Sequence, residues 1–569
     1  MFLISGMLIQ LAIIGGIIYA IARAVRGRSE RDRVDSGGAI SIRRLFQYAL
    51  LLAALVVAAS GVSGVLSQVI SDAAARRSTQ LAGPLALTVT GAPVFWLLGR
   101  WIWHQHQTDT AERASVGWSL YINVALIGSL IIAVSMAFAI AERFVNGDGY
   151  DGNLLAPLLV AVAVWSGHWV AWRRIPPTVL VDLPVVAGAA IGLGSMAGGA
   201  GFVIGLAIER VFEQARGVDV DRLFSDNLSM ALVAIGIGIV VWVWHWLYNG
   251  LDAERTTLWH GYVILVGILG GLLAAVIGGT TALFFVLQWM FADPEATSAA
   301  AHFQDASPAF AAGIVGLATW FYHRTVLGFD RTQVRTDIDR IYDYLVSGVA
   351  LATVAGALTT LIVALFTAFD REDVVSDGGS DLNIVIAAVT LLLVGAPLWA
   401  VAWRRAQQAL AATPEEESAS SARRVYLFAV FGIGGAVAFG ALTRFVFVLF
   451  ESALGERSGG ALIEDIRIPV ALLATTGAVA AYHWSVYRAE RNIAEPTVRR
   501  DVTLVWAGGD PGEIEERANV RINTVRRLDA GTTSPPTDDI VIAIDQADGD
   551  RLVVVAGSDG VDAIPVESR

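Results

Sequence analysis

Long apolar runs with very few charges constrain what this chain can fold into more than any other feature. Many of them match the roughly 20 residues that a helix needs to cross about 30 Å of hydrocarbon. Only 16% of the 569 residues are charged, whereas soluble domains carry about 25%. The sequence therefore predicts an all-α polytopic membrane protein with about thirteen transmembrane helices.

A short motif recurs at the end of every second apolar run. Four copies read Trp-x3-Arg, a fifth is one residue longer and the remaining one has lost its arginine: Trp96/Arg100, Trp169/Arg173, Trp320/Arg324, Trp484/Arg488, Trp399/Arg404 and Trp246. Tryptophan prefers the headgroup level, and arginine can extend to it. The motif predicts an interfacial anchor at one end of each of six two-helix hairpins. Because each hairpin crosses the bilayer twice, all copies point the same way.

The first helices of three copies also open alike. Arg44-Leu-Phe-Gln-Tyr48, Arg340-Ile-Tyr-Asp-Tyr344 and Arg424-Val-Tyr-Leu-Phe428 share an arginine, an aliphatic residue and two aromatic positions. Together with Gly395-Ala-Pro-Leu-Trp399 and the His-Trp pairs that close several copies, they resemble an uncharacterised bacterial membrane repeat family, catalogued only as a domain of unknown function. The resemblance covers roughly residues 40–490, is weakest in the third copy, and implies an architecture but no activity.

These patterns divide the chain into nine segments. We expect an N-terminal transmembrane helix, a cytoplasmic linker, six hairpin repeats and a soluble C-terminal domain, at 1–25, 26–41, 42–108, 115–175, 183–250, 257–325, 340–405, 423–490 and 498–569 respectively.

Arginine placement predicts the orientation, because basic residues mark the cytoplasmic ends of transmembrane helices. The run from Phe2 to Ala22 is followed by five arginines up to Arg33, and arginines recur in every second loop. The alternate loops, such as 146–153, are acidic or neutral, although Arg76, Arg77, Arg216 and Arg222 depart from the bias. We expect a bacterial cytoplasmic membrane protein with its N-terminus outside and its C-terminus inside.

The last segment has the composition of a soluble domain. Residues 501–506 alternate like a strand, 512–528 read as a helix, and 540–544 and 552–555 read as strands. We predict a small α/β domain on the cytoplasmic face that engages a protein partner. The formal net charge of −12 speaks against nucleic acid.

Several ionisable residues fall inside the predicted helices, where a charge is costly and is a candidate for function. They are Glu142, Arg143, Glu209, Arg210, Arg444 and Glu451. Arg444 is the strongest candidate, because it lies about two turns inside its helix. A role in gating or substrate binding competes with the simpler interpretation that these side chains extend to the outer interface.

Histidines gather near the predicted inner boundary: His104, His106, His168, His245, His260, His323 and His483. Histidines on neighbouring transmembrane helices can ligate haem, but no two stand four residues apart on one helix. The simpler interpretation is that they hydrogen-bond to headgroups and water. We predict no cofactor and no metal, and keep haem as an alternative.

Known catalytic motifs are absent, including the Walker sequence, His-Glu-x-x-His and Gly-x-Ser-x-Gly. The leading hypothesis is a non-enzymatic membrane scaffold or sensor with a cytoplasmic interaction domain. The first alternative is a transporter or channel with a path near Arg444, Glu142 and Glu209. The second is a haem or quinone redox protein.

Overall fold

The computed structural model describes most of the chain, with gaps chiefly at its start and in loops. The described residues are 37–71, 78–217, 221–292, 296, 298–328, 335–369, 378–455, 459–491, 500–508, 510–526, 535–549, 551–557 and 560–566. The predicted helix at 1–25 and most of the linker at 26–41 lie outside them.

The chain divides into two compact units. One comprises 1–405 and 435–476, and the other comprises 406–434 and 477–569. The boundary therefore passes through three long helices, including both helices of the last hairpin, and the second unit contains more than the C-terminal domain predicted from residue 498.

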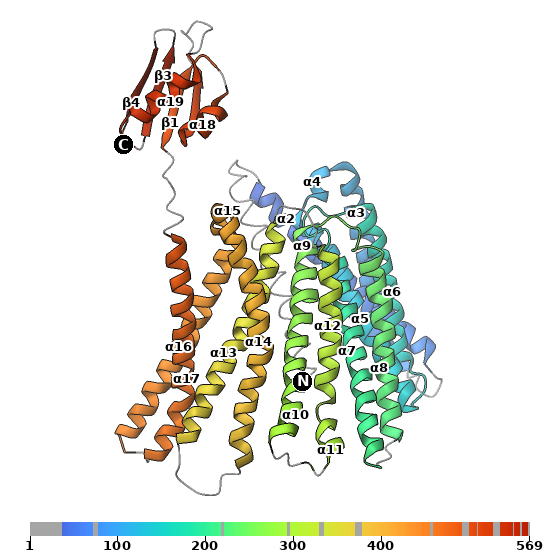
Figure 1. The fold of residues 1–569 in the computed structure, drawn as a ribbon. Coiled ribbons are helices and arrows are strands. Elements are labelled where there is room, and N and C mark those ends of the chain that lie inside the picture. Colours follow the sequence, from blue (N-terminus) through green and yellow to red (C-terminus); the bar gives the residue numbers. More distant parts are fainter. Residues whose placement is uncertain are drawn as a thin grey trace. The chain divides into compact units, whose positions relative to one another are not determined.

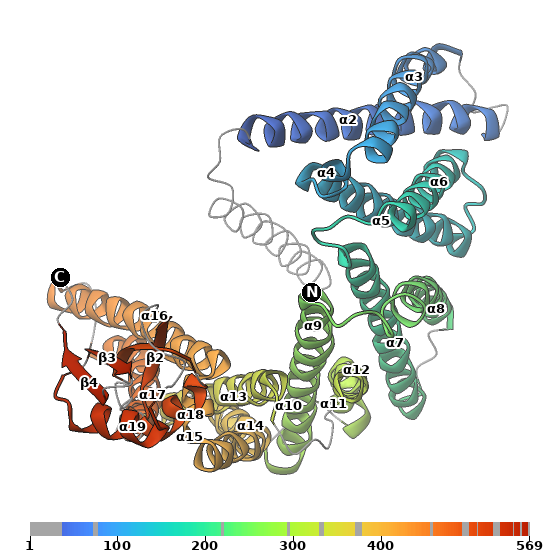
Figure 2. The same cartoon turned by 90° about the horizontal axis from the view of Figure 1, so that it is seen from above.

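Helices dominate the chain up to residue 491 and pair as successive hairpins (Figures 1 and 2). The first two hairpins pair α2 (Gly37–Ile70) with α3 (Ser78–Thr108), and α5 (Val116–Asn146) with α6 (Gly152–Arg174). The third pairs α7 (Leu183–Ala215) with α8 (Asp221–Trp242), which continues as η1 (Val243–Leu247); in the fourth, α9 (Thr257–Gly261), η2 (Tyr262–Leu269) and α10 (Gly270–Phe291) pair with α11 (Ala299–Gln304) and α12 (Ser307–Leu327). The fifth and sixth pair α13 (Asp337–Phe369) with α14 (Gly378–Ala412), and α16 (Ser421–Ala453) with α17 (Gly459–Arg491). Short helices α4 (Thr110–Arg113) and α15 (Pro414–Ala419) lie in two of the linkers between hairpins.

Neighbouring hairpins of the first unit pack in sequence order. Helix α2 contacts α5 and α6, α5 contacts α7 and α8, and α7 contacts α12. Within hairpins the backbones approach closely at small residues. A Cβ atom at Gly192 would lie 2.4 Å from the Trp242 nitrogen, and one at Gly271 would lie 2.5 Å from the Trp320 nitrogen. Such small-residue contacts are the usual way in which transmembrane helices associate.

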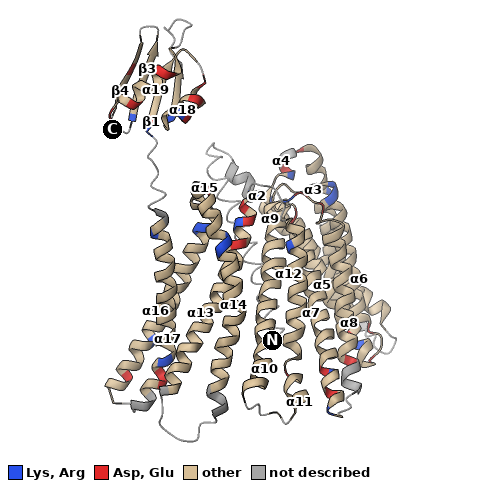
Figure 3. Cartoon of the chain, in the orientation of Figure 1, with Lys and Arg blue, Asp and Glu red and all other residues tan. Residues whose placement is uncertain are grey.

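The helices have the length and composition of membrane spans. Ten helices in the described part of the chain are long and apolar enough to cross a membrane. Helices α12 and α17, which we also expected to cross, are not among these ten. Charged residues lie mostly near the helix ends (Figure 3). The structure thus agrees with a multi-pass α-helical membrane protein, whereas the count of about thirteen stays a prediction.

The C-terminal region of the second unit is a four-stranded mixed sheet with two helices. Its elements are β1 (Asp501–Trp506), α18 (Pro511–Ala518), β2 (Arg521–Arg526), α19 (Thr537–Gln546), β3 (Arg551–Gly557) and β4 (Gly560–Pro565). The strand order is β2-β1-β3-β4, with β1 parallel to both neighbours and β4 antiparallel to β3. Alternate residues of β1 and β3 pack with both helices in one apolar core.

The sequence predicted this region only in part. The strands at 501–506 and 552–555 are confirmed. The helix predicted over 512–528 ends at Ala518, because Asn519 adopts a left-handed conformation, and Arg521–Arg526 form strand β2. The segment 540–544, predicted as a strand, belongs to α19, where Ile540 and Ile544 are both fully buried one turn apart. A short apolar run cannot separate these two structures by periodicity alone.

Candidate functional site

A buried histidine on the second helix recurs in five hairpins: His106, His168, His245, His323 and His483. In each, Nδ1 lies between 2.7 and 3.0 Å from the carbonyl oxygen four residues earlier. A carbonyl oxygen only accepts, so Nδ1 carries the hydrogen and Nε2 is left as an acceptor. Every one of these rings therefore needs a donor from elsewhere.

A tyrosine on the first helix faces Nε2 in four of these hairpins. The hydroxyl-to-Nε2 distances are 3.5 Å for Tyr48–His106, 2.8 Å for Tyr121–His168, 3.4 Å for Tyr262–His323 and 3.0 Å for Tyr426–His483. We call these contacts the tyrosine–histidine pairs. Hydrocarbon offers no water, so leaving such polar groups unpaired would cost several kcal/mol. Where the hydroxyl donates to Nε2, the pair thus joins the two helices of a hairpin and satisfies both partners.

In three of the four pairs the tyrosine stands at a fixed place in its helix. It lies six residues after the residue that precedes or caps the helix, as in Ser115 and Tyr121, Thr256 and Tyr262, and Ser420 and Tyr426. This spacing places the hydroxyl about two turns inside the helix.

The third hairpin has Gly188 at the same spacing, six residues after the cap residue Asp182. No described residue donates to Nε2 of His245. The His245 ring fills the vacant position instead, since a Cβ atom at Gly188 would lie 2.2 Å from its Cδ2. On its other side the ring packs edge-on against Trp165 and Trp169, at centroid distances of 5.7 and 5.5 Å.

An ionic cluster joins the first pair to the linker that follows it. Arg44 bonds Glu112 at 2.6 Å and Asp109 at 2.8 Å, and the Tyr48 hydroxyl donates to Glu112 at 3.0 Å. Tyr48 has a single hydrogen, and the charged acceptor at the shorter distance takes it. The 3.5 Å contact with His106 is accordingly the weakest of the four.

Aromatic rings carry the contact from one hairpin to the next. Trp118 of the second hairpin lies 4.7 Å from His106 of the first, centroid to centroid, and donates from Nε1 to the Ile175 carbonyl. Trp246 of the third hairpin lies 4.7 Å from Tyr262 of the fourth and donates to the Tyr322 hydroxyl at 2.9 Å. The paired residues are thus part of the joints between hairpins as well as within them.

The tryptophans of the repeated motif do not share one environment. Trp96 and Trp484 are 61% and 50% exposed, and each has the arginine of its motif, Arg100 or Arg488, within 6 Å of its ring. Trp320 has Arg324 at 5.7 Å, and Trp399 stacks on Trp403. The exposed positions are compatible with the predicted interface, which stays a prediction.

Trp169 and Trp246 differ from that expectation, since they are 6% and 1% exposed and pack between helices. Trp169 contributes to the core between the first hairpins, and Trp246 to the core around the fourth. The Arg173 guanidinium bonds the Asn249 side chain at 2.5 Å, and Arg404 is exposed. The motif therefore does not by itself indicate contact with lipid.

The ionisable candidates lie apart and bond locally. Arg444 is half exposed, 4.0 Å from Asp465 and over the Phe447 ring. Arg143 lies 3.9 Å from Asp151, Arg210 lies 3.8 Å from Glu213, and Glu209 accepts from Gln304 at 3.3 Å. Glu142 is exposed, and Glu451 is partly buried near the end of α16. These side chains belong to three hairpins and form no common site among the described residues.

The histidines correct one expectation. His104 is exposed, but the five histidines above are buried and bond to protein atoms where we expected headgroups and water. The sequence did hold a signal in three hairpins, namely the tyrosine six residues after a Ser or Thr at the start of the first helix. Aligning the copies by their arginines hides this spacing. That comparison aligns Phe428 with Tyr48, whereas in the structure Tyr426 takes the corresponding place.

A family model described as a domain of unknown function, DUF5671, matches residues 44–149 and 340–478. No curated protein and no solved structure matches the chain. The two matches are consistent with a domain that occurs twice.

The structure relates the two matched regions residue by residue. In the first, Glu112 precedes Ser115 by three residues and Tyr121 by nine; in the second, Glu417 precedes Ser420 and Tyr426 by the same intervals. Both glutamates are buried, at 4% and 0% exposed. The linker and the tyrosine therefore form one recurring element.

The first prediction concerns the tyrosine hydroxyl. Tyr121→Phe leaves Nε2 of His168 without a donor, and we expect it to lower the unfolding free energy by about 1–3 kcal/mol. Thermal unfolding of the full chain in detergent measures the loss. Tyr248→Phe is the control, because Tyr248 is 78% exposed. Equal stability of the two variants would contradict a structural role for the pair.

The second prediction concerns the third hairpin. Gly188→Ala should destabilise the chain, because its Cβ atom would overlap the His245 ring. Gly194→Ala, on the same helix with nothing within 4 Å of its Cβ position, should be close to neutral. Combining Gly188→Ala with His245→Ala should restore most of the stability. A loss that persists in the double variant would show that the ring is not what occupies this space.

Proposed function

We propose that this chain is a non-enzymatic membrane scaffold or sensor, in which the hairpins form a rigid array and the C-terminal domain engages a cytoplasmic protein. The observation that carries this proposal is the use of the buried polar side chains. In the tyrosine–histidine pairs, both ring nitrogens and the facing hydroxyl bond one another or the backbone. Side chains whose polar atoms are hydrogen-bonded in this way make the array more rigid, and these atoms are not available to bind a substrate.

The C-terminal domain supports the interaction half of the proposal. It has its own apolar core, which is independent of the hairpin cores. Helices α18 and α19 cover one face of the sheet. The other face is uncovered in the described residues, and Val525 on it is 49% exposed. Exposed apolar side chains bordered by charges, here Arg521 and Asp562, are typical of protein contact surfaces.

For the membrane arrangement we propose about thirteen crossings in a bacterial cytoplasmic membrane, with the N-terminus outside and the C-terminus inside. Support comes from the arginines in the linkers between hairpins, such as Arg113 and Arg255, and from the acidic loop within the second hairpin at Asp148 and Asp151.

A transporter or channel is the alternative, and one observation favours it. Arg444 lies inside a candidate membrane span and is half exposed. Against it, Arg444 has Asp465 as a partner. It also does not line the cavity of about 550 Å³ that lies between α2, α3, α5 and α6. A haem protein is less well supported, because the Nε2 atoms that would ligate iron accept tyrosine hydroxyls in three hairpins.

The third prediction separates the scaffold from the transporter. Liposomes containing the purified chain should leak ions down a gradient no faster than empty liposomes. Ion flux that requires the protein and falls in Arg444→Ala, but not in the control Arg488→Ala, would overturn the scaffold proposal in favour of transport.

The fourth prediction tests the orientation, and the absence of cysteine makes it clean. In intact cells a membrane-impermeant maleimide should label Asp148→Cys. It should label Asp548→Cys, in the C-terminal domain, only after lysis. The opposite pattern would reverse the proposed topology.

A further inference from the structure

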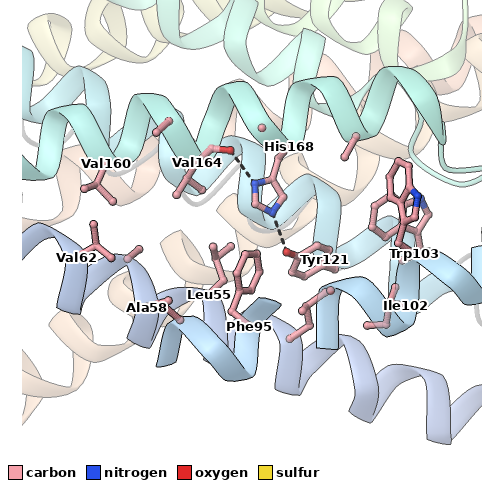
Figure 4. Close-up of a pocket in the computed structure, with 18 of the residues that line it drawn as sticks. Leu55, Ala58, Val62, Phe95, Ile102, Trp103, Tyr121, Val160, Val164 and His168 are labelled. Carbon is pink, nitrogen blue, oxygen red and sulfur yellow. Dashed lines mark hydrogen bonds between the residues drawn. The ribbon is translucent and has the colours of Figure 1, made fainter. Parts of the chain in front are cut away.

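A large cavity lies between the first two hairpins. Its volume is about 550 Å³, within the range of small-molecule sites. The walls come from α2, α3, α5 and α6 and are almost wholly apolar, with Leu55, Val62, Val160 and Val164 among the side chains that face it (Figure 4). Two glycines, Gly99 and Gly167, also line it, and Cβ atoms there would meet nothing within 4 Å.

Water does not suit this space. A buried water needs two to four polar partners. Among the polar groups at the wall, His168 is already bonded, to Val164 through Nδ1 and to Tyr121 through Nε2 (Figure 4). The wall helices are candidate membrane spans. The medium around the cavity is therefore hydrocarbon, and an empty space would forfeit dispersion contacts along every wall.

The same bonding pattern selects among apolar ligands. The carbonyl oxygens of a quinone or similar ring would need hydrogen-bond donors from the wall beside the ring. Tyr121 already donates to His168, and His168 already donates to its own helix. The Trp118 ring N–H, also at the wall, donates to the Ile175 carbonyl. A saturated chain with no functional groups meets these walls without leaving either side unpaired.

Polar recognition is offered at one end only. Trp103 lines the cavity, and its ring N–H makes no hydrogen bond within the described residues. Arg100 lies three residues earlier on α3, on the same helix face, and is exposed. An indole N–H beside a guanidinium matches the phosphate of a lipid headgroup in both charge and hydrogen bonding.

We propose that this cavity binds one acyl chain of a bilayer phospholipid, with the phosphate near Trp103 and Arg100. The lipid then occupies the gap between the first two hairpins and lies against the tyrosine–histidine pair of the second. This site is independent of whether the chain acts as a scaffold or as a transporter.

The experiment uses the full chain in nanodiscs that contain a phosphatidylglycerol analogue with a diazirine near the middle of one acyl chain. After illumination, mass spectrometry quantifies lipid adducts on the α2 segment 51–62. Gly167→Leu places a side chain in the cavity from the opposite helix without altering that segment. We expect it to lower the labelling of 51–62 about tenfold, the factor for a loss of about 1.4 kcal/mol in binding.

Gly128→Leu is the matched control, because its Cβ position is also open and it does not line the cavity. It should keep the labelling of the unchanged chain. Equal labelling of 51–62 in the unchanged chain and in Gly167→Leu would overturn the proposal.

A second measurement needs no variant. Organic extraction of the detergent-purified chain should release tightly held phospholipid. Release of an isoprenoid quinone in its place, or of no lipid, would overturn the assignment, as would crosslinks from the cavity to a second copy.

Discussion

A histidine N–H bonded to the carbonyl four residues earlier is the interaction on which the hairpin array depends. The bond is local, and the second helix makes it at all five of these histidines. Its consequence is not local, because it fixes the tautomer and turns Nε2 into an acceptor that the helix itself cannot satisfy. In hydrocarbon the donor must come from protein. The tyrosine hydroxyl of the first helix supplies it, and the two helices are thereby held in one register.

The third hairpin shows what happens when the first helix supplies no donor for Nε2 of the buried histidine. With Gly188 in place of tyrosine there is no donor, and the His245 ring moves against the bare helix and between tryptophans. The departure coincides with two π-helices, η1 around His245 and η2 beginning at Tyr262. Such irregular turns are rare in regular helices and often mark functional positions. All of these features fall between the regions 44–149 and 340–478 that match the family model.

Sequence patterns predicted the long apolar helices because the signal for them is local. Apolar length gives the helices, and the regular Trp-Arg motif gives the period. The environment of each tryptophan could not be predicted, since Trp96 and Trp246 share a motif yet are 61% and 1% exposed. That difference depends on which helix of a neighbouring hairpin packs beside the ring. The tyrosine–histidine pairs join residues 47 to 61 positions apart, which no single-helix pattern records.

The cavity between the first two hairpins follows from the way in which these hairpins are joined. Trp118 packs on His106, and Tyr121 holds His168. These contacts fix the spacing of the helices at the end where the linker lies. Gly99 and Gly167 provide no side chains to fill the space that this spacing leaves. Soluble cores avoid such gaps because burying more apolar surface stabilises them. Inside a bilayer, closing such a gap gives no comparable stabilisation, since a lipid chain can make the same dispersion contacts as a leucine. A membrane array held together by polar and aromatic joints can therefore retain a gap of this size, with lipid as a structural component of the wall.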